Sequence, residues 1–131
     1  MGIALPGVGV ALSEFRMFIP DLAFVRAERA HLLRRNLIEG APDLVVEVLS
    51  SDRRRDLVMK RGWYADAGVP EYWIMDPVNE TITILELSGS DYVERAVLTR
   101  NDTLTTPAIP GFVFQLEQLF GEPMRQQTLI S

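Results

Sequence analysis

Two carboxylates in this sequence stand inside apolar segments, where an acid needs either a partner or a cation. Asp21 precedes the run Leu22-Ala23-Phe24-Val25, and Glu47 interrupts an otherwise apolar run over residues 43–49. An ionised carboxylate in such surroundings is costly unless it is paired or coordinated. Two carboxylates from adjacent strands suit Mg²⁺, which takes few protein ligands and keeps several waters. The pattern therefore predicts a Mg²⁺ (or Mn²⁺) site shared by Asp21 and Glu47; a salt bridge from Glu47 to a nearby arginine is the alternative.

A lysine follows these acids on a segment with helical periodicity. Asp56 and Lys60 are four residues apart, acid before base, which is also the spacing of an ordinary surface ion pair. At about 100° per residue both fall in the middle of an apolar stripe, not at its rim. The stripe consists of Met59, Trp63, Ala67, Tyr64 and Leu57. We therefore expect Lys60 to point at the carboxylates, and a buried Asp56–Lys60 pair is the structural alternative.

Basic residues are concentrated in the first half of the chain, although the formal net charge is −5. Nine basic residues face six acidic ones between Arg26 and Arg61, whereas three face ten from Gly62 to the end. A polyanion such as DNA would approach the first half. Arg53, Arg54 and Arg55 could bind phosphates at the positive end of the helix, or they could form a solvated basic turn.

The elements that must position these residues alternate between strand and helix patterns. Residues 43–49 predict a central strand, and Ser50, Ser51 and Asp52 predict the start of a helix that Gly68 ends. The rest of the chain predicts strands near 15–19 and 21–25, a short helical turn near 31–37, a strand over 71–76, a β-hairpin over 81–98, then a short strand and a helical turn over 111–120. This order indicates an α/β fold with a mixed sheet.

Length and composition limit the classes of protein and of site. The 131 residues fit a single domain, and the absence of cysteine together with a single histidine excludes disulfides, thiolate chemistry and histidine-rich metal centres. Residues 1–12 are apolar but lack a basic leader region and are too short to span a bilayer, so we read them as a strand-like lead-in. The sequence predicts a cytoplasmic protein without membrane contact.

Three stretches resemble the Uma-type family of restriction endonucleases. They are Pro20-Asp21-Leu22-Ala23-Phe24-Val25, the run from Ala41 to Ser50, and Asp56…Lys60…Tyr64 followed by Gly68-Val69-Pro70-Glu71-Tyr72-Trp73-Ile74-Met75-Asp76-Pro77. The resemblance extends from about Phe15 to Phe120. That family is similar in fold to the PD-(D/E)XK nucleases, so the resemblance implies a restriction-endonuclease-like core.

The resemblance also implies roles for individual residues. Asp21 and Glu47 correspond to the two metal-binding acids, while the usual lysine two positions after the second acid is replaced by Leu49. Lys60, on the following helix, then takes the place of that lysine. Family members usually have a helix and hairpin ahead of the Pro-Asp strand, so we expect a single domain over 1–131 that is shortened at its N-terminus.

Three functions are compatible with these residues. The first is a magnesium-dependent endonuclease that cleaves DNA, with Asp21, Glu47, Lys60 and Asp56 as its catalytic residues. The second is a catalytically inactive nucleic-acid-binding domain, and the third is a structural or interaction domain built around a buried ion pair. Tyr72, Trp73 and the hairpin over 81–98 offer enough apolar surface that we expect a homodimer.

Overall fold

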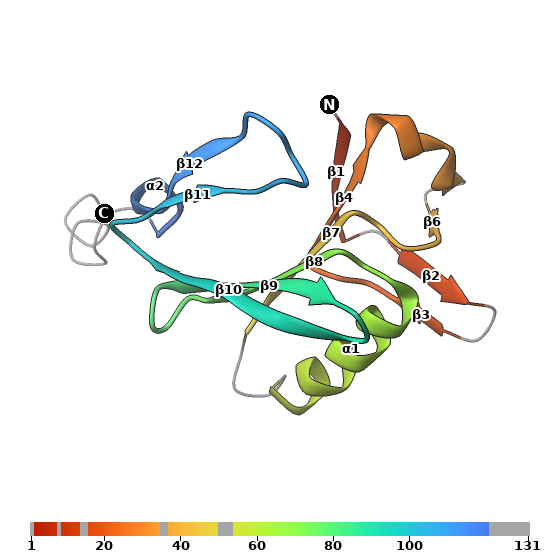
Figure 1. The fold of residues 1–131 in the computed structure, drawn as a ribbon, viewed down its shortest axis with the longest axis horizontal. Helices are drawn as coiled ribbons and strands as arrows, with labels where there is room; N and C mark the ends of the chain where they lie inside the picture. Colours follow the sequence, from red (N-terminus) through yellow and green to blue (C-terminus); the bar gives the residue numbers. More distant parts are fainter. Residues whose placement is uncertain (1, 8, 14–15, 35–36, 50–53, 121–131) are drawn as a thin grey trace, which may run out of the picture.

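The computed structural model describes residues 2–7, 9–13, 16–34, 37–49 and 54–120, and these form a mixed α/β architecture (Figure 1). Its main sheet has six strands in the order β1-β4-β7-β8-β9-β10. Their bounds are β1 (Gly2–Pro6), β4 (Leu22–Arg26), β7 (Leu44–Val48), β8 (Glu71–Asp76), β9 (Thr81–Ser88) and β10 (Asp91–Thr99). The predicted α/β class with a mixed sheet is therefore confirmed.

The strand β7 lies in the interior of the main sheet, as its apolar sequence predicted. It pairs antiparallel with β4 and parallel with β8. Parallel neighbours need a long crossover, and helix α1 (Arg54–Ala67) supplies it. The helix ends at Gly68, whose φ of 84° is the left-handed conformation that favours glycine at this position. The proposed capping residues Ser50, Ser51 and Asp52 lie outside the described residues.

Two smaller sheets flank the main one. The N-terminal one has the order β3 (Arg16–Phe18), β2 (Gly9–Ser13), β6 (Leu37–Glu39), β5 (Leu33–Arg34), and the C-terminal one pairs β11 (Thr103–Thr105) with β12 (Val113–Gln115). A five-residue helix α2 (Leu116–Phe120) follows β12. The lead-in forms β1 and β2. The helical turn expected at 31–37 was misplaced, because a 3₁₀ helix occupies Ala27–Leu32 and the chain then extends into β5.

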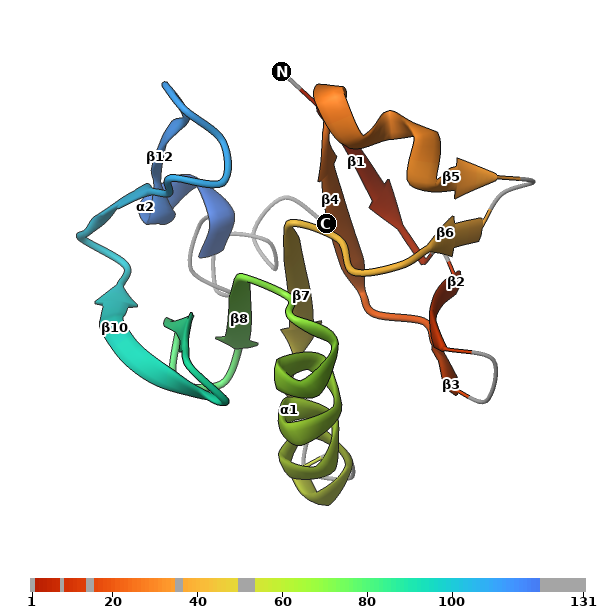
Figure 2. The same cartoon turned by 45° about the vertical axis from the view of Figure 1, so that its right-hand side comes forward.

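The two faces of the main sheet are covered by different elements (Figure 2). One face packs on β11, β12 and α2, through an apolar cluster that includes Leu44, Val46, Trp73 and Leu116. The other face packs on α1, through a cluster that includes Val45, Tyr64, Tyr72 and Tyr92. Alternate residues of β7 thus point into different cores, and the position of a polar residue along the strand decides which core it enters.

Candidate active site at the end of strand β7

Glu47 is completely buried near the carboxyl end of β7. Leu44 and Val46 point into the core beneath β11 and β12, whereas Val45 points toward α1. Alternation along the strand therefore places Glu47 on the α1 side. Such burial requires compensation, and the helix that follows β7 provides it.

Two side chains of α1 donate hydrogen bonds to the same oxygen of Glu47. Lys60 Nζ lies 3.2 Å from Glu47 Oε2, and the Tyr64 hydroxyl lies 2.9 Å from it. Lys60 and Tyr64 are one helical turn apart, so they project from the same face of α1. Both are buried, Lys60 at 7% exposed and Tyr64 at 0%. The expectation that Lys60 points at the carboxylates is therefore met at Glu47.

The stripe predicted for α1 was partly wrong. Met59, placed in it by the periodicity, is 50% exposed, while Lys60 and Tyr64 are buried. The helix therefore faces the sheet with the turn that carries Lys60 and Tyr64, and the polar atoms of these two side chains contact Glu47. Asp56 lies on α1, but its side chain is outside the described part of the structure, as are those of Arg54 and Arg55; Arg53 is outside altogether.

Asp21 lies beside the same end of β7. Leu22 is directly opposite Val46 in the antiparallel pair of β4 and β7, and continuing the register by one residue sets Asp21 opposite Glu47. Directly opposed residues project from the same side of a sheet. Asp21 Oδ2 also accepts a hydrogen bond of 2.6 Å from the backbone N–H of Val48, and Asp21 is exposed to solvent. A buried acid, Glu47, and an exposed acid, Asp21, therefore stand opposite each other at one end of the β4–β7 pair.

This donor set fits a hard cation held by two carboxylates. Asp21 and Glu47 both offer oxygen, the ligand type that Mg²⁺ and Mn²⁺ prefer, and Asp21 is open to water. Within the described residues no three acidic or histidine side chains gather into a group that could hold a metal. Two carboxylates with waters completing the coordination would be an ordinary arrangement for Mg²⁺.

The Tyr64 ring belongs to a row of three packed tyrosines, with Tyr72 and Tyr92. Its ring meets that of Tyr72 edge-on, with centroids 5.3 Å apart, and Tyr72 meets Tyr92 in the same way at 5.6 Å. The Tyr92 hydroxyl donates to the carbonyl oxygen of Val69 just beyond α1, and burial raises the pKa of Tyr92. The Tyr64 ring is therefore packed in a row of rings that runs toward the C-terminal end of the helix, while its own hydroxyl bonds Glu47.

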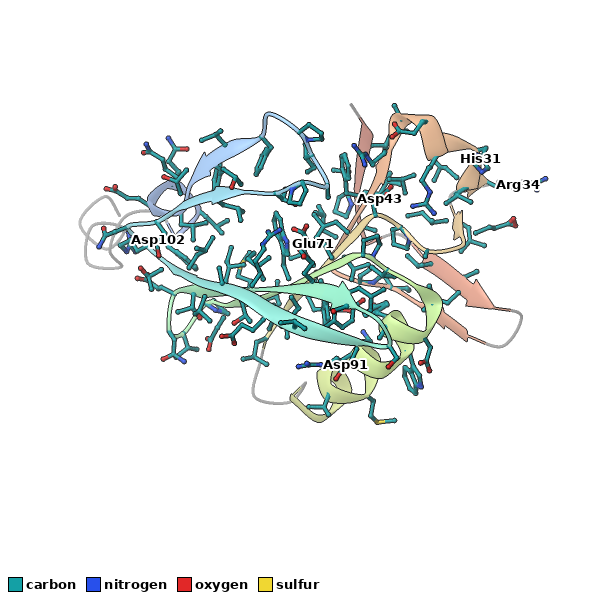
Figure 3. All side chains as sticks on the ribbon, viewed as in Figure 1. His31, Arg34, Asp43, Glu71, Asp91 and Asp102 are labelled. Carbon is teal, nitrogen blue, oxygen red and sulfur yellow. The ribbon has the colours of Figure 1, made fainter. Side chains whose placement is uncertain are left out.

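Some of the basic residues in the first half are already committed to partners. Arg29 donates to Asp43 at 2.8 Å and to the carbonyl oxygen of Ala41, and Asp43 also accepts from the backbone N–H of Arg26. His31 and Arg34 are exposed and lie toward the outer end of this segment (Figure 3). Among the described residues of this segment, His31 and Arg34 are thus more accessible to a polyanion than Arg29, although Arg34 lies 3.9 Å from the exposed acid Glu39.

A second buried acid, Glu71, lies on the opposite face of the sheet and was not singled out from the sequence. It is 3% exposed, and its Oε2 accepts hydrogen bonds from Trp73 Nε1, the Thr106 hydroxyl and Arg95. Arg95 is the residue at which the register of β9 and β10 shifts, a bulge that turns its side chain toward Glu71. The sequence signal for Glu71 was weak because it begins its strand, where acids are common and exposed.

A cavity of about 330 Å³ lies between the main sheet and the loop before β12. It adjoins the Glu71 cluster, which consists of Glu71, Trp73, Arg95 and Thr106. Arg26, Asp43, Glu86 and Pro107 also line the cavity. Glu71 lies near the middle of the molecule in Figure 3, between the main sheet and the β11–β12 unit. Each acid that lines the cavity already has a basic or hydroxyl partner. Through Thr106, Glu71 connects the main sheet with the loop before β12.

Comparisons with known proteins agree with this architecture. The sequence profile of the Uma2 family, described as "Putative restriction endonuclease", matches residues 1–117. The fold is similar to the crystal structure of "a putative nuclease belonging to DUF820" from Anabaena variabilis ATCC 29413, with a TM-score of 0.73 and 17% identity over 91% of this chain and 68% of that chain. No curated protein matches the sequence. Among the described residues, no helix is long and apolar enough to cross a membrane.

Proposed function

This chain belongs to the Uma2 family, and we propose that it hydrolyses phosphodiester bonds of DNA in a magnesium-dependent reaction in the cytoplasm. The observation that carries the proposal is the placement of exposed Asp21 opposite buried Glu47, with Lys60 3.2 Å from Glu47 Oε2. Two acids that can hold a metal ion, with a lysine beside them that can offset charge on a phosphate, suit metal-assisted hydrolysis of a phosphodiester.

Each residue has a distinct part in this proposal. Asp21 and Glu47 would hold Mg²⁺, which when bound activates water and stabilises charge on the phosphate. The Lys60 ammonium offsets the negative charge that develops on the phosphate oxygens. The sequence spacing alone makes Asp56, four residues before Lys60, a further candidate catalytic carboxylate. Arg53, Arg54 and Arg55 bind the DNA backbone where the helix begins.

The direct test is metal binding and cleavage by the wild-type chain. We expect a crystal soaked with Mn²⁺ to give an anomalous peak between Asp21 and Glu47, and the protein to nick supercoiled plasmid only when Mg²⁺ or Mn²⁺ is added. Asp21→Asn should remove both, while Glu71→Gln, which likewise replaces a carboxylate by an amide but at the buried glutamate of the opposite face, should keep both. Cleavage that persists in chelator, or an anomalous peak elsewhere, would overturn the proposal.

The buried ion pair between Lys60 and Glu47 also supports a second candidate, a nucleic-acid-binding domain without catalysis. Glu47 Oε2 already accepts hydrogen bonds from Lys60 and Tyr64, so the acid is compensated before any cation arrives. In that case the protein would bind DNA with an affinity that falls steeply with salt, but Mn²⁺ would neither bind nor change that affinity. Calorimetric titration with Mn²⁺ separates the two candidates.

We also propose that the protein is a homodimer, through the hairpin first expected but without Tyr72 and Trp73. Tyr72 and Trp73 are 0% and 7% exposed, because they pack into the two cores of their own chain. The hairpin keeps exposed apolar residues, Val93 at 57% and Val97 at 46%, on the edge strand β10. An edge strand with exposed valines can pair with a second copy. Light scattering should give twice the chain mass, and Val93→Lys should halve it.

A further inference from the structure

We propose that Tyr64 is a positioning residue of the candidate active site: its hydroxyl keeps the Glu47 carboxylate oriented while Lys60 turns to the DNA phosphate. This inference rests on the proposed function, because it assigns to Tyr64 a part in that same site. Tyr64 is completely buried, and it belongs to none of the residues from which catalysis was first expected.

The first step of the argument is that one oxygen of Glu47 is shared by two donors of different kinds. Lys60 carries a charge on a long side chain with several rotatable bonds, and Tyr64 is neutral and rigid. If Lys60 alone oriented Glu47, the lysine could not move to a phosphate without releasing the acid. With the Tyr64 hydroxyl 2.9 Å from the same oxygen, the acid keeps a donor when the lysine leaves.

The second step is that Tyr64 is fixed from several sides. Its ring meets Tyr72 edge-on, and its backbone carbonyl accepts a hydrogen bond of 3.1 Å from the N–H of Val69. Arg61, next to Lys60 on α1, donates to the carbonyl oxygen of Tyr92 and to Asp91, which ties α1 to β10. A donor held by packing and by its own backbone does not have to be ordered when the substrate binds, and such support is what metal-binding carboxylates need.

The third step is that the hydroxyl and the ring can be separated experimentally. Tyr64→Phe removes the oxygen and keeps the aromatic contacts with Tyr72. Tyr92→Phe is a matched control, because it also removes one buried tyrosine hydroxyl from the same row, but that hydroxyl donates to Val69 and not to Glu47. Any effect of a lost buried hydroxyl on packing is common to both variants.

The experiment is a titration of the folded proteins with Mn²⁺, followed by plasmid nicking. Loss of a hydrogen-bond partner behind a metal ligand typically weakens affinity about 10–100-fold. We expect Tyr64→Phe to raise the Kd for Mn²⁺ at least about tenfold and to slow nicking, and Tyr92→Phe to leave the Kd within about twofold of wild type. If Tyr64→Phe does not fold, 3-fluorotyrosine at position 64 makes the hydroxyl a stronger donor, and the Kd should fall.

The outcomes separate this inference from the function on which it rests. If the wild type binds and uses Mn²⁺ but Tyr64→Phe has the wild-type Kd, the role of Tyr64 is overturned and the nuclease proposal stands. Equal weakening by Tyr64→Phe and Tyr92→Phe would overturn it as well, since packing would then explain both. A wild type that binds no Mn²⁺ overturns the proposed function and this inference together.

Discussion

The main sheet carries a buried glutamate on each face, and the two are compensated in opposite ways. Glu47, beneath α1, receives both of its described side-chain hydrogen bonds from a single helix. Glu71, beneath the β11–β12 unit, receives hydrogen bonds from Trp73 on its own strand, Arg95 on β10 and Thr106 in the loop before β12. The Glu71 cluster connects distant parts of the chain, whereas the Glu47 cluster connects one strand with the helix that follows it.

The two glutamates also differ in the acids that stand opposite them. Glu47 has a second acid, Asp21, directly across the strand pair and open to solvent. Glu71 also faces an exposed acid, Glu86, directly across β8 and β9, but Arg95 donates to both of these acids. What distinguishes the two clusters is therefore the donors: Lys60 and Tyr64 of one helix at Glu47, and an arginine that bridges two acids at Glu71. The predictions that follow alter one cluster and use the other as the reference.

The largest effect should come from neutralising the acids of the candidate site. Asp21→Asn or Glu47→Gln should weaken Mn²⁺ binding by more than about 100-fold, because loss of an outer partner alone costs 10–100-fold. Glu71→Gln should leave Mn²⁺ binding and nicking unchanged. Calorimetric titration of the three variants measures this, and a Glu71→Gln variant that loses metal binding would remove the distinction between the two clusters.

The second effect concerns the buried ion pair between Lys60 and Glu47. Lys60→Met keeps the helix propensity and the apolar stem but leaves Glu47 without its charged partner, so we expect unfolding stability to fall by about 3–5 kcal/mol. Nicking should be abolished in the fraction that remains folded. Arg95→Met should cost less, because Arg95 is 29% exposed and water can reach Glu71 in its place. Urea denaturation of both variants gives the comparison, and equal losses would contradict it.

The strand and helix around Glu47 could largely be predicted from the sequence, because their signals lie in neighbouring residues. The apolar run around Glu47, the helix ending at Gly68 and the spacing of Lys60 each depend on neighbouring residues, so the strand, the helix and the orientation of Lys60 toward the acids were predicted. Tyr64 stands one turn after Lys60, a spacing that could have indicated a shared face. It was missed because an aromatic residue in an apolar stripe is ordinarily core.

The Glu71 cluster could not be predicted, because two of the three partners of Glu71 are distant in the sequence. Thr106 is 35 residues away and Arg95 is 24. Their meeting depends on the bulge in β10 and on how the β11–β12 unit folds back over the sheet, and no short-range pattern encodes either. The same limit affected Met59 and Tyr72, whose burial depends on which elements cover each face.

The third effect is a moderate loss of stability at the reference cluster. Glu71→Gln keeps the shape of the side chain and one acceptor oxygen but removes the charge that Arg95 faces. A hydrogen bond to a charged group contributes about 1.5–3 kcal/mol, so we expect a loss in the lower part of that range. Thermal denaturation measures it. A gain in stability would show that burying the Glu71 charge costs more than its three donors return.

The smallest effect should come from Asp91, the exposed acid that ties β10 to α1 on the Glu47 side (Figure 3). The backbone N–H of Tyr92 and then the Arg61 guanidinium hold the pKa of Asp91 below its ordinary value of 3.8. Because the folded-state pKa is the lower one, the stabilisation is fully present above pH 3.8 and is lost as the pH falls through the folded-state value.

Asp91→Asn should therefore have a slightly lower urea midpoint than wild type at pH 7, and the difference between the two midpoints should close in acid. The Kd for Mn²⁺ should not change, since Asp91 contacts Arg61 and not Glu47. A gap that persists at pH 2 would mean that the interaction does not depend on the charge of Asp91, and a changed Kd would extend the candidate site to β10.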